Sequence, residues 1–305
     1  MLSRAIDGYL AVRRAAGFAL RVDAGLLRRF ARFAADHGET HVQRQTAIAW
    51  AAEAPSPYQR ERRLGMVRRF VVHARAEDPG HEWLPQHVFA HRRTRPFPYL
   101  FSDRELEQLL SATARLRPRG SLRPLTYWTF FGLLAATGLR VSEALHLVLD
   151  DIGADGLLVR ETKFRKSRLV PLHETAAAAL ERYLARRHAV AGNAAHVFVA
   201  PTGGPLTYPM VNGTFHYLLR AVDLRTTVGG RAPAPRIHDL RHRFAVRALE
   251  CAAGDRGRTA QHVLALSTYL GHAHVADTYW YLHATPHLMR RIADACEAGG
   301  AGGTP

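Results

Sequence analysis

The chain has 305 residues, of which 47% are hydrophobic and 22% are charged, a composition typical of a globular protein of about two domains. No apolar run approaches the roughly 18 residues that a membrane span needs. Charges within the first fourteen residues argue against a signal peptide, so we expect a cytoplasmic protein without a membrane anchor. Two cysteines exclude a disulfide framework or a cysteine-type zinc site. The net charge of +16 points to a polyanionic partner.

The first third of the chain reads as a run of helices over residues 2–76. Apolar side chains recur at helical spacing within residues 25–37 and again within 58–75, and arginines crowd the opposite faces. Residues 1–99 hold 17 Arg and 9 acidic side chains, the densest basic charge of the chain. An Arg-rich composition alone is the competing explanation. Several basic helices in one small domain favour contacts with phosphates.

Prolines separate this region from the rest of the chain. Four of them between residues 78 and 99 prevent a continuous helix. We therefore expect a helical domain over residues 1–90, a Pro-rich linker at 91–99, a second domain over 100–292 and a disordered tail at 293–305.

The second domain is predicted to be mainly α with a small β-sheet or hairpin. Its first helix begins at Ser102, where Glu105 completes a capping box. A long apolar segment ends at Gly138, which suits a helix C-terminus. The β-rich stretches on either side of FRK within residues 157–172 predict a hairpin. Helical patterns then return around residues 173–187, 208–222, 238–250 and 258–270.

Lysine occupies only two of the 42 basic positions, Lys163 and Lys166, and both lie in the predicted hairpin. A lysine ammonium can give up a proton, with an unperturbed pKa of about 10.4, whereas a guanidinium effectively cannot. Lysine at this place therefore suggests proton transfer.

Five short pieces of the second domain follow one another in a fixed order. They are ATGLRVSEAL around Arg140, the Lys-bearing hairpin ending in RLVPL, IHDLRH at 237–242, YLGH at 269–272, and Tyr281 nine residues after the last histidine. Together they resemble the tyrosine recombinases, the phage-integrase and Xer-like group, over about residues 100–290. The resemblance implies a helical core-binding domain followed by a tyrosine-recombinase catalytic domain. The segment from 266 to 289 is most similar to members carried by mobile elements.

The resemblance also implies six catalytic positions: Arg140, Lys163, His238, Arg241, His272 and Tyr281. The chemistry of these side chains agrees with it. Two guanidiniums can bind the non-bridging oxygens of one phosphodiester and balance the charge of its pentavalent transition state. Tyrosine then attacks phosphorus to form a covalent phosphotyrosine. Lysine suits the acid that protonates the leaving oxygen, and the histidines suit proton transfer or hydrogen bonding.

Each of these roles has a competitor in the sequence. Lys166 is the alternative acid, although alignment backwards from RLVPL selects Lys163. Tyr279 lies two residues before Tyr281 in the aromatic cluster DTYWYLH, and an aromatic cluster commonly serves packing. Glu143, in RVSE, matches an acidic position of the family that orients neighbouring groups, and an exposed helix carboxylate is an equal interpretation.

Two further expectations concern the C-terminal third. His238 and His272 are 34 positions apart, longer than in a compact Xer-like member, which predicts an insertion that lengthens a loop near CAAGDRGRTA. The chain has 18 histidines, but no cysteine or carboxylate cluster completes a metal site with them, and the glycine-rich segments lack a GK[ST] phosphate loop. We expect neither a metal nor any other cofactor.

These observations predict a site-specific recombinase or integrase that cleaves and rejoins DNA strands through a 3′-phosphotyrosine intermediate. Its expected partner is double-stranded DNA, with a homo- or hetero-tetramer assembled on it, in the cytoplasm and associated with the nucleoid. The alternatives are nicking and closing of the type IB topoisomerase kind, and an inactive DNA-binding accessory factor.

Overall fold

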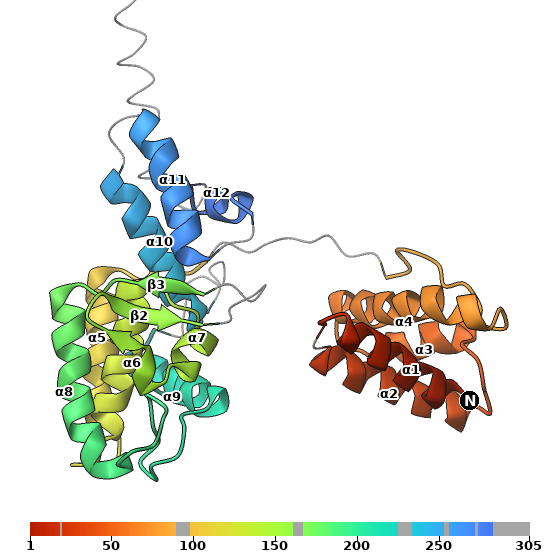
Figure 1. Cartoon of the computed structure of the whole chain (residues 1–305), viewed down its shortest axis with the longest axis horizontal. Helices are drawn as coiled ribbons and strands as arrows, with labels where there is room; N and C mark the ends of the chain where they lie inside the picture. The colour runs from red at the N-terminus through yellow and green to blue at the C-terminus, as the bar shows by residue number, and fades with distance from the viewer. Residues whose placement is uncertain are drawn as a thin grey trace, which may run out of the picture. The chain divides into compact units, whose positions relative to one another are not determined.

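The computed structural model describes residues 1–18, 20–89, 98–160, 167–224, 234–252, 256–271 and 274–282. The chain divides into two compact units, Met1–Arg95 and Pro96–Pro305, which Figure 1 draws. The predicted linker at 91–99 lies mostly outside the described residues, and the tail at 293–305 lies wholly outside them. None of the described helices combines the length and the apolar run that a bilayer crossing requires.

The N-terminal unit consists, in its described part, of the helices α1 (Leu2–Ala15), α2 (Arg21–Asp36), α3 (Arg44–Ala52) and α4 (Pro57–Glu77). The predicted stripes form its core. Leu27 and Phe30 of α2 are fully buried, as are Val67 and Phe70 of α4. The helical prediction for residues 2–76 is confirmed. α4 begins at an N-cap serine, Ser56, whose hydroxyl accepts the Gln59 N–H at 3.3 Å.

The arginines of this unit fall into two groups. Some hold the unit together: the Arg60 Nε donates to the Ala54 carbonyl at 2.8 Å, Arg63 lies over the Trp50 ring, and Arg68 pairs with Glu61 at 3.1 Å. Others are exposed and make no hydrogen bond or ion pair with another described residue; these include Arg29, Arg32 and Arg62. Only the second group has its charge directed to solvent, so the charged faces predicted from the sequence are smaller than expected.

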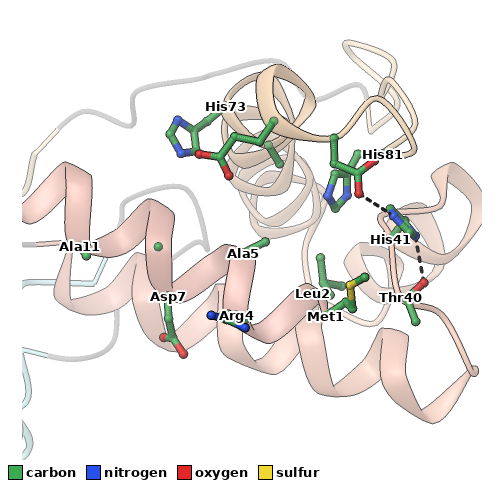
Figure 2. A pocket seen from close by; sticks show the side chains of 14 residues that line it. Met1, Leu2, Arg4, Ala5, Asp7, Ala11, Thr40, His41, His73 and His81 are labelled. Atoms are coloured by element: carbon green, nitrogen blue, oxygen red, sulfur yellow. Dashed lines mark hydrogen bonds and ion pairs between the residues drawn. The ribbon is translucent and has the colours of Figure 1, made fainter.

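A pocket of about 810 Å³ opens in the N-terminal unit between α1, the α2–α3 loop and the end of α4. Figure 2 shows His41 in this pocket, bonded on one side to Thr40 and on the other to a carboxylate. That carboxylate is Asp78, 2.8 Å from the His41 Nε2. Burial and the nearby His41 lower the pKa of His81, whose Nδ1 accepts the Val42 N–H at 3.0 Å. These bonds join the α2–α3 loop to the end of α4.

The second unit begins with α5 (Asp103–Ala112), whose capping box between Ser102 and Glu105 forms as predicted. α6 (Arg123–Thr137), α7 (Val141–His146), α8 (Glu174–Ala191) and α9 (Tyr208–Ala221) follow, with short 3₁₀ turns at Thr113–Arg115 and Leu149–Asp151. Buried aromatic rings of α6 and α9 form the centre of one continuous core, which includes Phe130, Phe131 and Phe215. The fold class is confirmed, because helices dominate and one small sheet accompanies them.

The sheet has the order β1-β2-β3, with β1 (Ile152–Gly153), β2 (Gly156–Val159) and β3 (Arg168–Val170) all antiparallel. In the β2–β3 register Val159 lies opposite Arg168 and Leu157 lies opposite Val170. The two ends of the predicted hairpin are therefore confirmed. Its tip, residues 161–166, lies outside the described residues.

The last three helices, α10 (His238–Ala252), α11 (Arg256–Leu270) and α12 (Ala276–Leu282), pack against one another, as Figure 1 shows. The expected long loop near CAAGDRGRTA is wrong: helix continues to Ala252 and resumes at Arg256. Helix therefore occupies the part of this segment that the structure describes. α12 was not predicted, since its seven residues are too few to show a period.

Candidate active site

Arg140 lies in the turn between α6 and α7. Gly138 ends α6 with φ of 62°, the left-handed conformation that glycine adopts without cost, and Arg140 is the N-cap of α7. Its backbone N–H donates to Glu143 Oε2 at 2.9 Å and its Nη1 donates to Glu143 Oε1 at 2.6 Å. Glu143 is therefore a buried partner of Arg140 and not an exposed helix carboxylate.

Arg241 lies on α10 and is 2% exposed. Its Nη1 donates to the Gly138 carbonyl at 2.6 Å and its Nη2 donates to the Leu270 carbonyl at 2.7 Å. Burial lowers the pKa of Arg241 to about 10, and the charge of Arg140 acts in the same direction, while Tyr281 and Glu143 oppose it. The guanidinium is thus a buried cation at neutral pH, with its orientation determined by two backbone carbonyls.

Two successive carbonyls at the end of α11 bring the two arginines together. Leu270 accepts from Arg241, and Gly271 accepts from the Arg140 Nη2 at 3.0 Å. Gly271 has φ of 65°, and a Cβ there would lie 3.7 Å from the Arg140 Nη1. The structure therefore places the predicted arginine pair at one site, although the two residues are 101 positions apart in sequence.

Tyr281 lies on α12 and is 2% exposed, packed with Val246, Leu249 and Leu266 in the core of the last three helices. Its ring lies 5.4 Å from that of His242, and its charge state influences the pKa of Arg241. Tyr279 is 50% exposed and belongs to no core. Of the two tyrosines that the sequence offered, Tyr281 is the buried one, and it is the one that acts on the pKa of Arg241.

Two of the six predicted positions, and the alternative acid, are not among the described residues. Lys163, its competitor Lys166, and His272 lie outside the described residues. The structure describes the strands that flank the two lysines: β2 ends at Val159 and β3 begins at Arg168.

His238 is the exposed first residue of α10, three positions before Arg241. Its ring packs edge-on against His242, with the ring centroids 4.6 Å apart. His242 was not predicted, yet it is 4% exposed and lies between His238 and Tyr281. Helical spacing of four residues after His238, inside the motif IHDLRH, was the signal that could have identified it.

Arg168 is the second residue that the sequence did not single out. It begins β3, and both of its terminal nitrogens donate to Glu143, at 3.1 and 2.8 Å. Although burial alone would raise the pKa of Glu143, the bonds from Arg168 and from the Arg140 N–H lower it to about 2. The site thus contains a buried carboxylate that stays ionised between two arginines.

Within the described ranges no three His, Cys, Asp or Glu side chains are arranged to hold a metal ion. The described part of the site instead contains the guanidiniums of Arg140 and Arg241, the neighbouring rings of His238 and His242, and Tyr281. Guanidiniums in this setting are suited to binding a phosphodiester, and a tyrosine beside them is suited to attacking it.

The comparisons with known proteins agree with this chemistry. The phage integrase family matches residues 100–287. The integrase/recombinase-type protein y4rB of Sinorhizobium fredii is 39% identical over 94% of this chain and 94% of its own length. Tyrosine recombinase XerD of Caulobacter vibrioides is 32% identical over 79% of this chain and 75% of its own. The chain belongs to the phage integrase family and is a tyrosine-type site-specific recombinase.

Two solved structures show the same fold at low identity. The Tn1549 transposon integrase, in complex with transposon right end DNA, matches with a TM-score of 0.64 and 17% identity over 96% of this chain and 98% of its own. The XerH recombinase, bound to a palindromic difH substrate, matches with a TM-score of 0.64 and 16% identity over 90% and 78% of the two chains.

Proposed function

We propose that this chain cuts and rejoins duplex DNA through a covalent bond between Tyr281 and a 3′ phosphate. The observation that carries the proposal is the placement of buried Arg241 beside both Arg140 and Tyr281. A buried cation with its orientation determined by backbone carbonyls supplies charge stabilisation without reorganisation when a phosphorane forms.

The proposed step exchanges one phosphodiester bond for another. The Tyr281 oxygen attacks phosphorus and gives its proton to a base, for which His238 and His272 are the candidates. The bond from phosphorus to the 5′ oxygen breaks, and Lys163 protonates that oxygen. Arg140 and Arg241 bind the two non-bridging oxygens, and His238 and His272 serve proton transfer or hydrogen bonding. Attack by a DNA 5′ hydroxyl on the phosphotyrosine reverses the step and reseals a strand, so no external energy source is needed.

The N-terminal unit, proposed to span residues 1–90, is assigned the role of a DNA clamp. Exchange between two duplexes needs two cuts on each, which favours four protomers on the DNA. XerH is bound to its difH substrate and a lambda integrase dimer is bound to a core site. Acting in this way on chromosomal or mobile DNA, the protein would work in the cytoplasm, at the nucleoid.

Covalent trapping tests this function. A pool of 30-base-pair duplexes with randomised sequence and single nicks is incubated with the chain, and protein–DNA adducts are recovered after denaturation and sequenced. A nick lets the short leaving strand diffuse away, so we expect adducts to accumulate on a shared sequence, in equal yield with and without EDTA. Recovery of no adduct would reject strand cleavage and favour an accessory DNA-binding role, whereas a single-duplex nicking and closing activity would favour the topoisomerase alternative.

The exposed arginines of the N-terminal unit are expected to contact phosphates. Changing Arg29, Arg32 and Arg62 together to glutamine should reduce the slope of log affinity against log salt by about 1 to 3, because each lost phosphate contact on B-DNA contributes about 0.9. Binding to a random-sequence duplex at several salt concentrations measures the slope.

The control for this slope changes Arg28 to glutamine and Asp7 to asparagine together. These residues form an exposed ion pair at 2.9 Å, so the double change leaves the net charge unaltered and should leave the slope unaltered. An unchanged slope in the triple variant would show that the basic charge of this unit is only compositional.

A further inference from the structure

Arg168 connects the β2–β3 hairpin to the arginine site. Its Nη1 and Nη2 donate to the two oxygens of Glu143 at 3.1 and 2.8 Å, a bidentate pair. Among the described residues Glu143 is the only acceptor for this guanidinium, and the Arg168 Nε has no partner there. Within the described part of the chain, every hydrogen bond that this side chain donates therefore goes to one carboxylate.

Glu143 transmits this contact to Arg140. The same two carboxylate oxygens accept the Arg140 Nη1 at 2.6 Å and the Arg140 N–H at 2.9 Å. Gly271 completes the cluster: its carbonyl holds the Arg140 Nη2, and a Cβ at Gly271 would lie 3.2 Å from the Arg168 Nη1. Both guanidiniums thus pack against the space that the missing side chain leaves.

We propose that Arg168 is a positioning residue, which holds the Glu143 carboxylate and, through it, the Arg140 guanidinium in the orientation that binds the scissile phosphate. This role rests on the proposed function and adds to it a connection between the β2–β3 hairpin and Arg140. A buried carboxylate without Arg168 would lose two charge-assisted bonds and one neighbouring cation.

The cluster has an electrostatic consequence that can be measured. Three arginines act on the Glu143 carboxylate: Arg140 at the start of α7, Arg168 on β3 and Arg241 on α10. Tyr269 of α11 lies near Arg168, and burial raises the pKa of Tyr269. With a pKa of about 2 for Glu143, the carboxylate is ionised throughout the working range. Without Arg168 its pKa rises, so the group becomes neutral as the pH falls, and a neutral carboxyl holds Arg140 less well.

The experiment measures the single-turnover rate of adduct formation on the duplex sequence recovered by covalent trapping. The ratio of the Arg168→Met rate to the wild-type rate is followed from about pH 8 to about pH 5. We expect a loss of roughly 10- to 100-fold that grows toward low pH, since misplacement of a catalytic group by about 1 Å costs on the order of 10²-fold. Adding Glu143→Gln should remove the pH dependence of the ratio. Arg168→Lys, which keeps the charge but not the fork, should recover part of the rate.

Arg160→Met is the matched control. Arg160 ends the β2 side of the same hairpin, is 55% exposed in its side chain and pairs with Asp151 instead of Glu143. Arg160→Met removes the same charge from the same hairpin but leaves the Glu143 contacts in place. We therefore expect a rate near that of the wild type, and a ratio of the two rates that does not depend on pH.

The outcomes separate the inference from the function it rests on. If the wild type forms no adduct, the proposed function fails. If the wild type reacts and Arg168→Met matches it, or loses rate equally at every pH, the positioning role is wrong. If Arg168→Met does not fold, Arg168→Lys decides: a rate equal to that of the wild type overturns the inference, and a several-fold loss with normal DNA binding supports it.

Discussion

Tyr281→Phe is expected to abolish the covalent adduct, with a fall of at least about 10⁴-fold, because the variant lacks the oxygen that we propose attacks phosphorus. DNA affinity should be unchanged. Phenylalanine fills nearly the same volume among Val246, Leu249 and Leu266, and volume-conserving changes in a core cost little. Denaturing gels of the trapping reaction measure the adduct, and binding to the same duplex measures affinity.

Tyr279→Phe is the matched control, two residues earlier on the same helix. Its side chain is 50% exposed, whereas Tyr281 is 2% exposed, so adduct formation should stay within about twofold of the wild type. An adduct on Tyr279 in the Tyr281→Phe variant, mapped by mass spectrometry of the peptide, would overturn the assignment of the nucleophile.

Lys163→Ala is expected to slow cleavage of ordinary DNA by about 10²- to 10⁴-fold, the usual contribution of a general acid. Replacing the bridging 5′ oxygen with sulfur should restore most of the rate, because a thiolate, with a thiol pKa of about 8.5, leaves without a proton while an alkoxide does so poorly. Rates of adduct formation on the oxygen and sulfur duplexes give the comparison.

Two further variants make this result specific. Arg140→Ala should show no rescue by sulfur, since its proposed role is to stabilise charge on the non-bridging oxygens. Lys166→Ala should behave like the wild type on both duplexes. Equal rescue of Arg140→Ala and Lys163→Ala, or rescue of Lys166→Ala alone, would show that Lys163 is not the acid.

Short-range sequence patterns predicted the elements whose ends or buried faces depend on neighbouring residues only. The capping box at Ser102 and the glycine end of α6 at Gly138 depend on neighbouring residues only, and both formed as expected. The apolar stripe of α4 is long enough to show its period, and its residues are buried.

The parts that were missed depend on long-range contacts. Arg168 was read as a strand residue because nothing in its neighbourhood reveals a carboxylate 25 positions earlier. Arg60 and Arg63 were read as solvent charges, although they donate to backbone carbonyls of Ala54 and Trp50, which precede their helix. Arg68 was read in the same way, although it pairs with Glu61 two turns earlier on α4. The loop near residue 255 was inferred from spacing between motifs, and spacing cannot distinguish a longer loop from longer helices.

The burial of Tyr281 has a consequence for the fate of a broken strand. A phosphotyrosine is an activated ester, and water competes with the DNA hydroxyl that should reseal it. Tyr281 lies in an apolar core formed by three helices, with 2% of its surface exposed, so few water molecules can approach its oxygen from the protein side. Exclusion of water protects reactive intermediates from hydrolysis. Packing of α12 would therefore preserve the break as a reversible one and guard against a permanent lesion in the DNA.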